Sequence, residues 1–204
     1  MQISKNTYNQ VAVVILAAGE SNRMNTPKPF LRFDAKRVFI DKIIDEYRQF
    51  GCSRIVVTIN KKHTEWISYI AAKSSSDSII FIENNHPEYE RFYSVKLGLQ
   101  NIDDVDFSFI HNIDNPFIDQ EILNNIYEFK SDGGYVVPNY LDKGGHPILL
   151  HREAINKIIS ETNNSVNLKN ILSSLKRINC DSGSDKVLIN INTQDDYEKY
   201  FQGN

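Results

Sequence analysis

The chain has 204 residues, of which 41% are hydrophobic and 24% are charged, a composition typical of a globular protein. Its 23 basic and 26 acidic residues give a net charge of −3, which excludes a bulk positive field for binding nucleic acid or an anionic membrane surface. The length favours a single domain over residues 1–204, with residues 1–10 as an N-terminal tail.

The cysteines and the N-terminus bear on the compartment. Cys52 and Cys180 have no CxxC spacing and lie in apolar surroundings, which indicates reduced structural thiols. Residues 1–10 contain no apolar core of signal-peptide length, and no apolar run reaches the ~18 residues of a membrane-spanning helix. We therefore expect a cytoplasmic protein with no membrane partner.

Short β-rich apolar runs alternate along the chain with segments of helical spacing, which predicts a mostly parallel sheet covered by helices on both faces. The predicted strands are 11–17, 54–59, 78–82, 107–110, 134–138, 146–150 and 187–191. The predicted helices are 38–50, 63–73, 93–101, 119–130, 153–162, 168–175 and 194–201. Because 134–138 and 146–150 are joined by a Gly-rich turn, they should add antiparallel strands, so the expected fold is three-layer α/β with a mixed sheet.

The loop after the first predicted strand, LAAGESNRM, lies where open α/β sheets bind ligands. Its small residues let backbone N–H groups approach an anion, and it adds a hydroxyl and the cation of Arg23, with a second cation at Lys28 just beyond it. The dinucleotide fingerprint and the Walker loop are both absent. On these residues alone an anion pocket and a plain turn with two solvated cations remain equally open. The candidate residues are Leu16, Ala17, Ala18, Gly19, Ser21, Arg23 and Lys28.

The longer run LAAGESNRMNTPKPFL resembles the signature of the MobA/MocA-like nucleotidyltransferases, the molybdenum cofactor guanylyl- and cytidylyltransferases, whose relatives include the methylerythritol phosphate cytidylyltransferase. Asn25 stands where these relatives usually have glycine. The resemblance implies one nucleotidyltransferase domain with the Rossmann-like, mostly parallel sheet of the nucleotide-diphospho-sugar transferase (GT-A-like) type. It also implies that the candidate residues of this loop bind a nucleoside triphosphate, with Arg23 and Lys28 as catalytic cations.

Two further motifs suggest a magnesium site. Nucleotide transfer to a phosphate brings anions together and is typically assisted by a divalent cation. Asp114 in IDNP and Asn190 in VLININTQDDY match the family's metal-binding positions, so the resemblance implies Mg²⁺ at these two residues. Thr193 and Asp196 also read as an ordinary capping box. His111 is expected to be a packed or hydrogen-bonded histidine, because magnesium prefers oxygen ligands.

Weaker motifs complete the resemblance. Ser94 in ERFYSVKLGLQ matches a serine beside the nucleotide base, and Arg91 is typical of the cytidylyltransferase branch. His146 in GGHP matches the acceptor side of the family's cleft. An N-capped helix and a tight turn would explain the two segments equally well.

The resemblance therefore implies a magnesium-dependent transferase that moves NMP from an NTP to a small phosphorylated acceptor and releases pyrophosphate. CTP is slightly favoured, and molybdopterin, a phosphorylated alcohol and a sugar phosphate all remain open as acceptors. One alternative is a sugar-nucleotide-dependent glycosyltransferase with an Asp104-x-Asp106 metal site. Another is a non-catalytic nucleotide-binding regulatory domain.

Overall fold

The computed structural model describes residues 11–19, 24, 26–60, 62, 65–73, 78–102 and 105–201. The strands are β1 (Val11–Ala17), β2 (Arg54–Ile59), β3 (Ile79–Glu83), β4 (Phe107–Asn112), β5 (Gly134–Tyr140), β6 (Lys143–Gly144), β7 (Ile148–His151) and β8 (Lys176–Asp181). The helices are α1 (Phe39–Phe50), α2 (Glu65–Lys73), α3 (Glu90–Leu99), α4 (Gln120–Glu128), α5 (Arg152–Ser160), α6 (Leu168–Leu172) and α7 (Gln194–Phe201). Short 3-10 helices lie at η1 (Lys28–Phe30), η2 (Pro87–Tyr89) and η3 (Asp185–Leu188).

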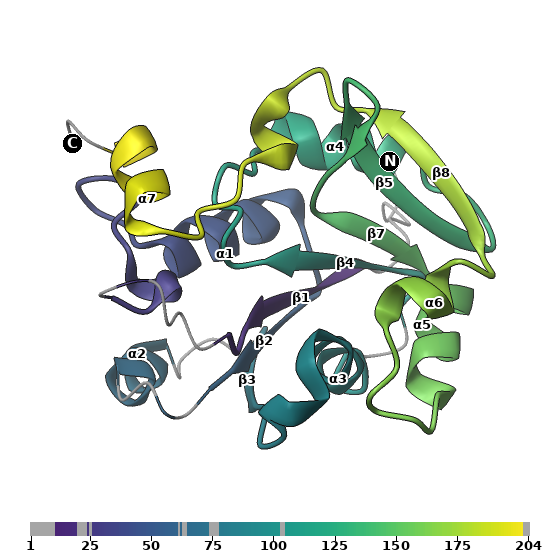
Figure 1. The fold of residues 1–204 in the computed structure, drawn as a ribbon, viewed down its shortest axis with the longest axis horizontal. Coiled ribbons are helices and arrows are strands. Elements are labelled where there is room, and N and C mark those ends of the chain that lie inside the picture. Colours follow the sequence, from purple (N-terminus) through teal and green to yellow (C-terminus); the bar gives the residue numbers. More distant parts are fainter. Residues whose placement is uncertain are drawn as a thin grey trace, which may run out of the picture.

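The described strands form one mixed sheet in the order β3-β2-β1-β4-β7-β5-β6, with β8 also paired to β5. Parallel pairing joins β3, β2, β1 and β4, whereas β7 is antiparallel to both β4 and β5. Figure 1 shows α3, α5 and α6 on one side of this sheet and α1 and α4 on the other. The expected three-layer α/β fold with a mixed sheet is confirmed.

The central strand β1 shows why this sheet is covered on both faces. Its sequence VAVVILA is apolar at every position, and nearly every side chain is buried, as expected of a parallel strand between two helical layers. Val13 and Ile15 pack into the core under α1 and α4, whereas Ala12 and Val14 pack into the core under α3 and α5. The same strand therefore anchors both hydrophobic cores.

Residues at the helix termini explain where α1 ends and where α4 begins. In α1, apolar residues recur along the buried face, and Gly51 follows at a φ of 93°, a left-handed conformation that glycine adopts without strain. In α4, the Asp119 side chain accepts a hydrogen bond from the Ile122 N–H and caps the helix.

The predictions fail in the last quarter of the chain. The predicted strand 187–191 is not a strand, because residues 185–188 form η3 and the following segment runs irregularly. The eighth strand is instead β8, which pairs in parallel with β5. Its sequence KRINCD has four exposed positions and only one fully buried residue, Cys180, so it carries little apolar signal for a strand. The predicted helix 168–175 also stops early, at Leu172.

Among the described residues, no helix is both long enough and apolar enough to cross a bilayer.

A close helix–strand approach gives a stability test. At Gly98 in α3, an added Cβ would overlap the Cγ1 of the buried Val14 in β1. We expect Gly98→Ala to lower the free energy of unfolding by about 1–3 kcal/mol, because a β-branched core side chain has little room to move. Urea denaturation measures the change.

The double variant Gly98→Ala/Val14→Ala supplies the control. Removing the Val14 methyl groups makes room for the new Cβ, so the double variant should be less destabilised than the sum of the two single changes. Strictly additive effects would contradict the proposed overlap.

Candidate active site

A cleft of about 770 Å³, here called the main cleft, opens at the C-terminal ends of β1 and β4. Seven of the residues singled out from the sequence line it: Leu16, Ala18, Gly19, Lys28, Arg91, Ser94 and Asp114. Ala17 is buried in the core below the loop. Ser21 and Arg23 lie outside the described residues. The loop and the Asp114 segment, about 90 residues apart in the chain, therefore share one wall.

The pairing of β1 with β4 brings these two segments together. Leu16 lies opposite Asn112 in the parallel register, and the Ile113 N–H donates to the Leu16 carbonyl at 3.2 Å. Because both strands end at the same edge, Ala18 and Gly19 leave the sheet beside Asp114. Neither glycine nor alanine fills the space above the sheet, so backbone groups face the cleft.

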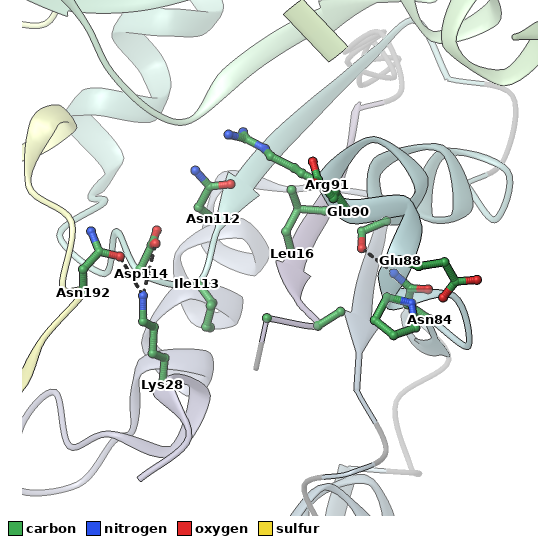
Figure 2. Close-up of a pocket in the computed structure, with 14 residues that line it drawn as sticks. Leu16, Lys28, Asn84, Glu88, Glu90, Arg91, Asn112, Ile113, Asp114 and Asn192 are labelled. Carbon is green, nitrogen blue, oxygen red and sulfur yellow. Dashed lines mark hydrogen bonds and ion pairs between the residues drawn. The ribbon is translucent and has the colours of Figure 1, made fainter. Parts of the chain in front are cut away.

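Lys28 connects the cleft to the C-terminal segment. Its Nζ donates to Asn192 Oδ1 at 2.8 Å and to Asp114 Oδ2 at 3.4 Å, as Figure 2 shows. The flanking Pro27 and Pro29 restrict the backbone of η1. The side chains of Lys28 and Asp114 are only 13% and 24% exposed. A cation and a carboxylate are thus held together at the floor of the cleft.

Asn190, predicted as the second metal ligand, is placed elsewhere. Its Nδ2 donates to the Leu188 carbonyl, and it lines a separate hollow beside α7. Asn192 occupies the position beside Asp114 instead. The capping box explains this, because Asp196 Oδ2 accepts from the Asn192 N–H at 2.9 Å and fixes that residue at the start of α7.

Ser94 lies in the main cleft as part of a hydrogen-bonded pair that the sequence did not reveal. Asn84, which follows β3, donates from Nδ2 to Ser94 Oγ at 2.9 Å, and its Oδ1 accepts from the His86 N–H at 2.8 Å. Both side chains are buried. The one sequence feature that could have identified Asn84 is its position directly after a strand.

Arg91 stands on the ridge that borders the main cleft. The ridge consists of Glu88, Glu90 and Arg91, at the junction of η2 and α3. Glu90 has a φ of 53°, a conformation that costs a non-glycine residue on the order of 1–3 kcal/mol. The Arg91 guanidinium is open to the cleft but crowded by protein, and this desolvation lowers its pKa, against an opposing effect of the Asp114 charge.

His146, predicted to face the acceptor, does not line the main cleft. It lines a second hollow of about 760 Å³ on the other side of the ridge, here called the side pocket, together with Arg91, Tyr135, Val137, Leu168 and Arg177. A cis peptide bond joins His146 to Pro147. Burial, and to a lesser degree repulsion from Arg91, lower the pKa of His146 to about 4, so its ring is neutral near pH 7.

His111 is a buried, hydrogen-bonded histidine, which confirms the expectation for this residue. Its Nε2 lies 2.9 Å from the Asn115 carbonyl, which can only accept, so Nε2 carries the proton. Its Nδ1 then accepts from the Tyr47 hydroxyl at 2.9 Å. Desolvation lowers the pKa of His111 to about 3.

The placement of Asp106 argues against the alternative Asp-x-Asp metal site. Asp106 precedes β4, at the opposite end of this strand from Asp114, and its carboxylate accepts from Arg152 Nη2 at 2.8 Å. Asp104 lies outside the described residues. Among the described residues, moreover, no three His, Cys, Asp or Glu side chains gather to hold a metal. A cation at this cleft would depend on Asp114, amide oxygens and the ligand itself.

Comparison with known families decides the assignment. The model of the MobA-like NTP transferase domain matches residues 13–178. The chain belongs to this family. The match spans the loop, the Asp114 segment and most of the sheet, so this MobA-like chain is a member of a nucleotidyltransferase family with the Rossmann-like fold described above.

Individual relatives are distant. Over 118 residues the chain is 28% identical to the 2-C-methyl-D-erythritol 4-phosphate cytidylyltransferase of Lachnospira eligens, which covers 56% of this chain and 51% of that protein. The chain spans only a third to a half of the length of the curated relatives it matches.

Solved structures share the fold of this MobA-like chain. A nucleotidyl transferase from Methanothermobacter thermautotroptrophicus superposes with a TM-score of 0.74 at 15% identity, covering 96% of this chain and 100% of the other. Rv0371C from Mycobacterium tuberculosis H37Rv, solved in complex with manganese, superposes with a TM-score of 0.70 at 18% identity, covering 96% and 99%.

The neutral histidines predict how stability depends on pH. The pKa of His111 falls from 6.5 in the unfolded chain to about 3 in the folded protein. Below pH 6.5 the unfolded state therefore binds a proton that the folded state does not, and the free energy of unfolding falls by up to about 1.4 kcal/mol per pH unit for this group. His146 adds a second contribution of the same sign between pH 6.5 and about 4.

We expect His111→Gln to reduce this slope, because glutamine can donate and accept in the same place but does not titrate. Urea denaturation between about pH 4 and pH 8 measures the slope for both proteins. Parallel pH profiles of the variant and the wild type would contradict the assignment of this effect to His111.

Proposed function

We propose that the protein transfers a nucleoside monophosphate from a nucleoside triphosphate, with CTP favoured, to a phosphorylated acceptor and releases pyrophosphate. The observation that carries the proposal is the convergence of Lys28, Asp114 and Asn192 on one point of the main cleft. Family membership and the open backbone of Ala18 and Gly19 support it.

The residues present fit a divalent cation. Asp114 Oδ1 is buried and accepts no hydrogen bond from any described residue, and Asn192 Oδ1 is oriented toward the same point. Magnesium is typically held by one or two carboxylates together with substrate phosphates, which suits a cleft with one carboxylate at its floor. We assign Asp114 and Asn192 to this role. When bound, the ion would offset the charge of the phosphates.

In this proposal the cationic side chains of the protein bind and orient the triphosphate. A phosphate oxygen of the acceptor forms a bond to the α-phosphorus as the bond from that phosphorus to the bridging oxygen breaks, and the electron pair leaves with pyrophosphate. Lys28 would exchange its present partners for the β,γ-phosphates and stabilise the departing charge, with Arg23 assigned the same task. Catalysis in this proposal consists of positioning and electrostatic stabilisation.

The Asn84–Ser94 pair offers a hydrogen-bond donor that a cytosine base can use. Since Ser94 Oγ accepts from Asn84 Nδ2, its own proton remains to be donated into the cleft. The Watson–Crick edge of cytosine offers the O2 and N3 acceptors for such a donor. Backbone groups of Leu16 to Gly19 would contact the rest of the base. The cytidylyltransferase named among the relatives points to the same nucleotide.

Pyrophosphate release tests the function directly. The full chain is incubated with each of the four triphosphates, with magnesium or manganese, and with a panel of phosphomonoesters. We expect release that requires both the metal and an acceptor, and that is fastest with CTP. Nucleotide binding without release for any acceptor would favour a regulatory domain, and transfer from a sugar nucleotide would favour a glycosyltransferase.

Loss of either charged partner at the cleft floor should slow the reaction. We expect Lys28→Ala and Asp114→Ala each to lower the rate of pyrophosphate release by about 100-fold or more, the scale for removing one group that stabilises the transition state. Steady-state kinetics measure the effect, and circular dichroism checks the fold. Rates near wild type in both variants would contradict the mechanism.

Two asparagines separated by one residue provide a matched pair. Asn192→Ala removes the oxygen beside Asp114 and should lower pyrophosphate release at least about tenfold and raise the metal concentration required. Asn190→Ala removes a side chain that donates to the Leu188 carbonyl in its own loop and should leave both quantities near wild type. A loss of activity in Asn190→Ala with near-normal activity in Asn192→Ala would instead favour Asn190 as the metal ligand and contradict the role assigned to Asn192.

A further inference from the structure

The side pocket is as large as the main cleft and adjoins it. The two hollows share the ridge of Glu88, Glu90 and Arg91 and have volumes of about 760 and 770 Å³. Sites that bury drug-sized ligands measure ~300–1,000 Å³. A phosphate group, or a short polyol that carries one, would therefore leave most of the side pocket unfilled.

The floor of the side pocket is apolar. Val137 of β5 and Ile148 of β7 lie beneath it, and Leu168 and Leu172 of α6 form its side wall. These four side chains are 6–9% exposed, so a few of their atoms still face the pocket. A ligand body that covers them gains from the removal of apolar surface from water. The floor therefore favours a ligand with an apolar part.

Cations from three different elements surround this floor. Arg91 of α3, Lys169 of α6 and Arg177 of β8 line the pocket, and no carboxylate among the described residues forms an ion pair with any of them. The Arg177 guanidinium lies against Gly144, where a Cβ would come within 2.9 Å of its Nη2. Arginine binds phosphate through a planar set of donors.

The acids of the ridge do not cancel this charge. Glu88 Oε1 lies 2.9 Å from His86 Nδ1, and its carboxylate offsets only one of the three cations that line the pocket. Glu90 is the other carboxylate among the described lining residues. His146 adds no charge near pH 7, because burial lowers its pKa to about 4. Its Nδ1 is buried and has no hydrogen-bond partner among the described residues. The pocket thus combines an apolar floor, a net positive wall and an unsatisfied ring nitrogen.

Arg91 joins this pocket to the reaction centre. It lines both hollows, and Figure 2 shows it extending from α3 toward Asn112. The negative charge of Asp114 acts on the Arg91 guanidinium, and the positive charge of Arg91 acts on His146. A phosphate bound at Arg91 would therefore lie where the side pocket meets the main cleft.

We propose that the side pocket binds the acceptor as a phosphomonoester with a sizeable apolar body. The phosphate binds at Arg91, and the body packs on the apolar side chains of Val137, Ile148, Leu168 and Leu172. This assignment rests on the proposed nucleotidyl transfer and narrows its acceptor. The bond that forms runs from an oxygen of this phosphate to the α-phosphorus, and the bond that breaks releases pyrophosphate. Compact polyol phosphates are correspondingly poor acceptors.

Calorimetric titration of the full chain compares two probes that carry the same phosphate group, 1-naphthyl phosphate and glycerol 3-phosphate. We expect 1-naphthyl phosphate to bind at least about tenfold more tightly, since the aromatic body alone covers the floor. Equal affinities, or tighter binding of glycerol 3-phosphate, would overturn the proposal.

Two neighbouring exposed cations on β8 allow a test of where the probe binds. Arg177 lines the side pocket, whereas Lys176 is not among its lining residues, and successive side chains of a strand point to opposite faces. Arg177→Glu should weaken 1-naphthyl phosphate about tenfold and leave the affinity for CTP unchanged, and Lys176→Glu should change neither. Equal losses in both variants would show a diffuse charge effect and contradict the assigned pocket.

Pyrophosphate release with the same two probes and CTP separates this proposal from the proposed function. Turnover with glycerol 3-phosphate and none with 1-naphthyl phosphate would retain nucleotidyl transfer and overturn the acceptor class. Tight, Arg177-dependent binding of 1-naphthyl phosphate, with no turnover of any of the four triphosphates for any phosphomonoester, would uphold the chemistry of the pocket and contradict nucleotidyl transfer.

Discussion

The parallel pairing of β1 with β4 is the constraint on which the site depends. It fixes Leu16 opposite Asn112, so a loop that begins at residue 18 and an aspartate at residue 114 emerge at one edge of the sheet. Both strands are buried between two hydrophobic cores, and a shift of one residue would turn every core side chain toward the wrong layer. The geometry of the cleft is therefore held by the packing of the whole sheet.

Polar contacts at the floor of the cleft connect this part of the sheet to the C-terminal segment of the chain. Lys28 is joined to Asn192 across 164 positions of sequence, and Asn192 is itself fixed by the capping box of α7. The aromatic side chains of α7 pack on those of the segment after η1, as in the contact of Phe201 with Phe33. The C-terminal helix thus has a defined part in positioning a lysine near the start of the chain.

Much of the fold could be predicted from the sequence, because long apolar strands such as β1 and amphipathic helices such as α1 carry strong local signals. The strand β8 could not, since its sequence has a polar face and is held chiefly by its pairing with β5. For the candidate site, the loop and Asp114 were identified by motif, but the choice between Asn190 and Asn192 depended on the path of the backbone after η3. Asn84 was missed because its importance comes from a contact with Ser94.

The strained backbone at Glu90 limits which parts of the two hollows can change during evolution. The same few residues form a wall of both hollows, and the strained backbone at Glu90, held at a positive φ, leaves little freedom to remodel them. The side chains of α6 and β8 that line the side pocket do not line the main cleft. Over evolutionary time, new ligand preferences in that pocket can therefore accumulate on α6 and β8 while the cleft beside β1 and β4 stays intact.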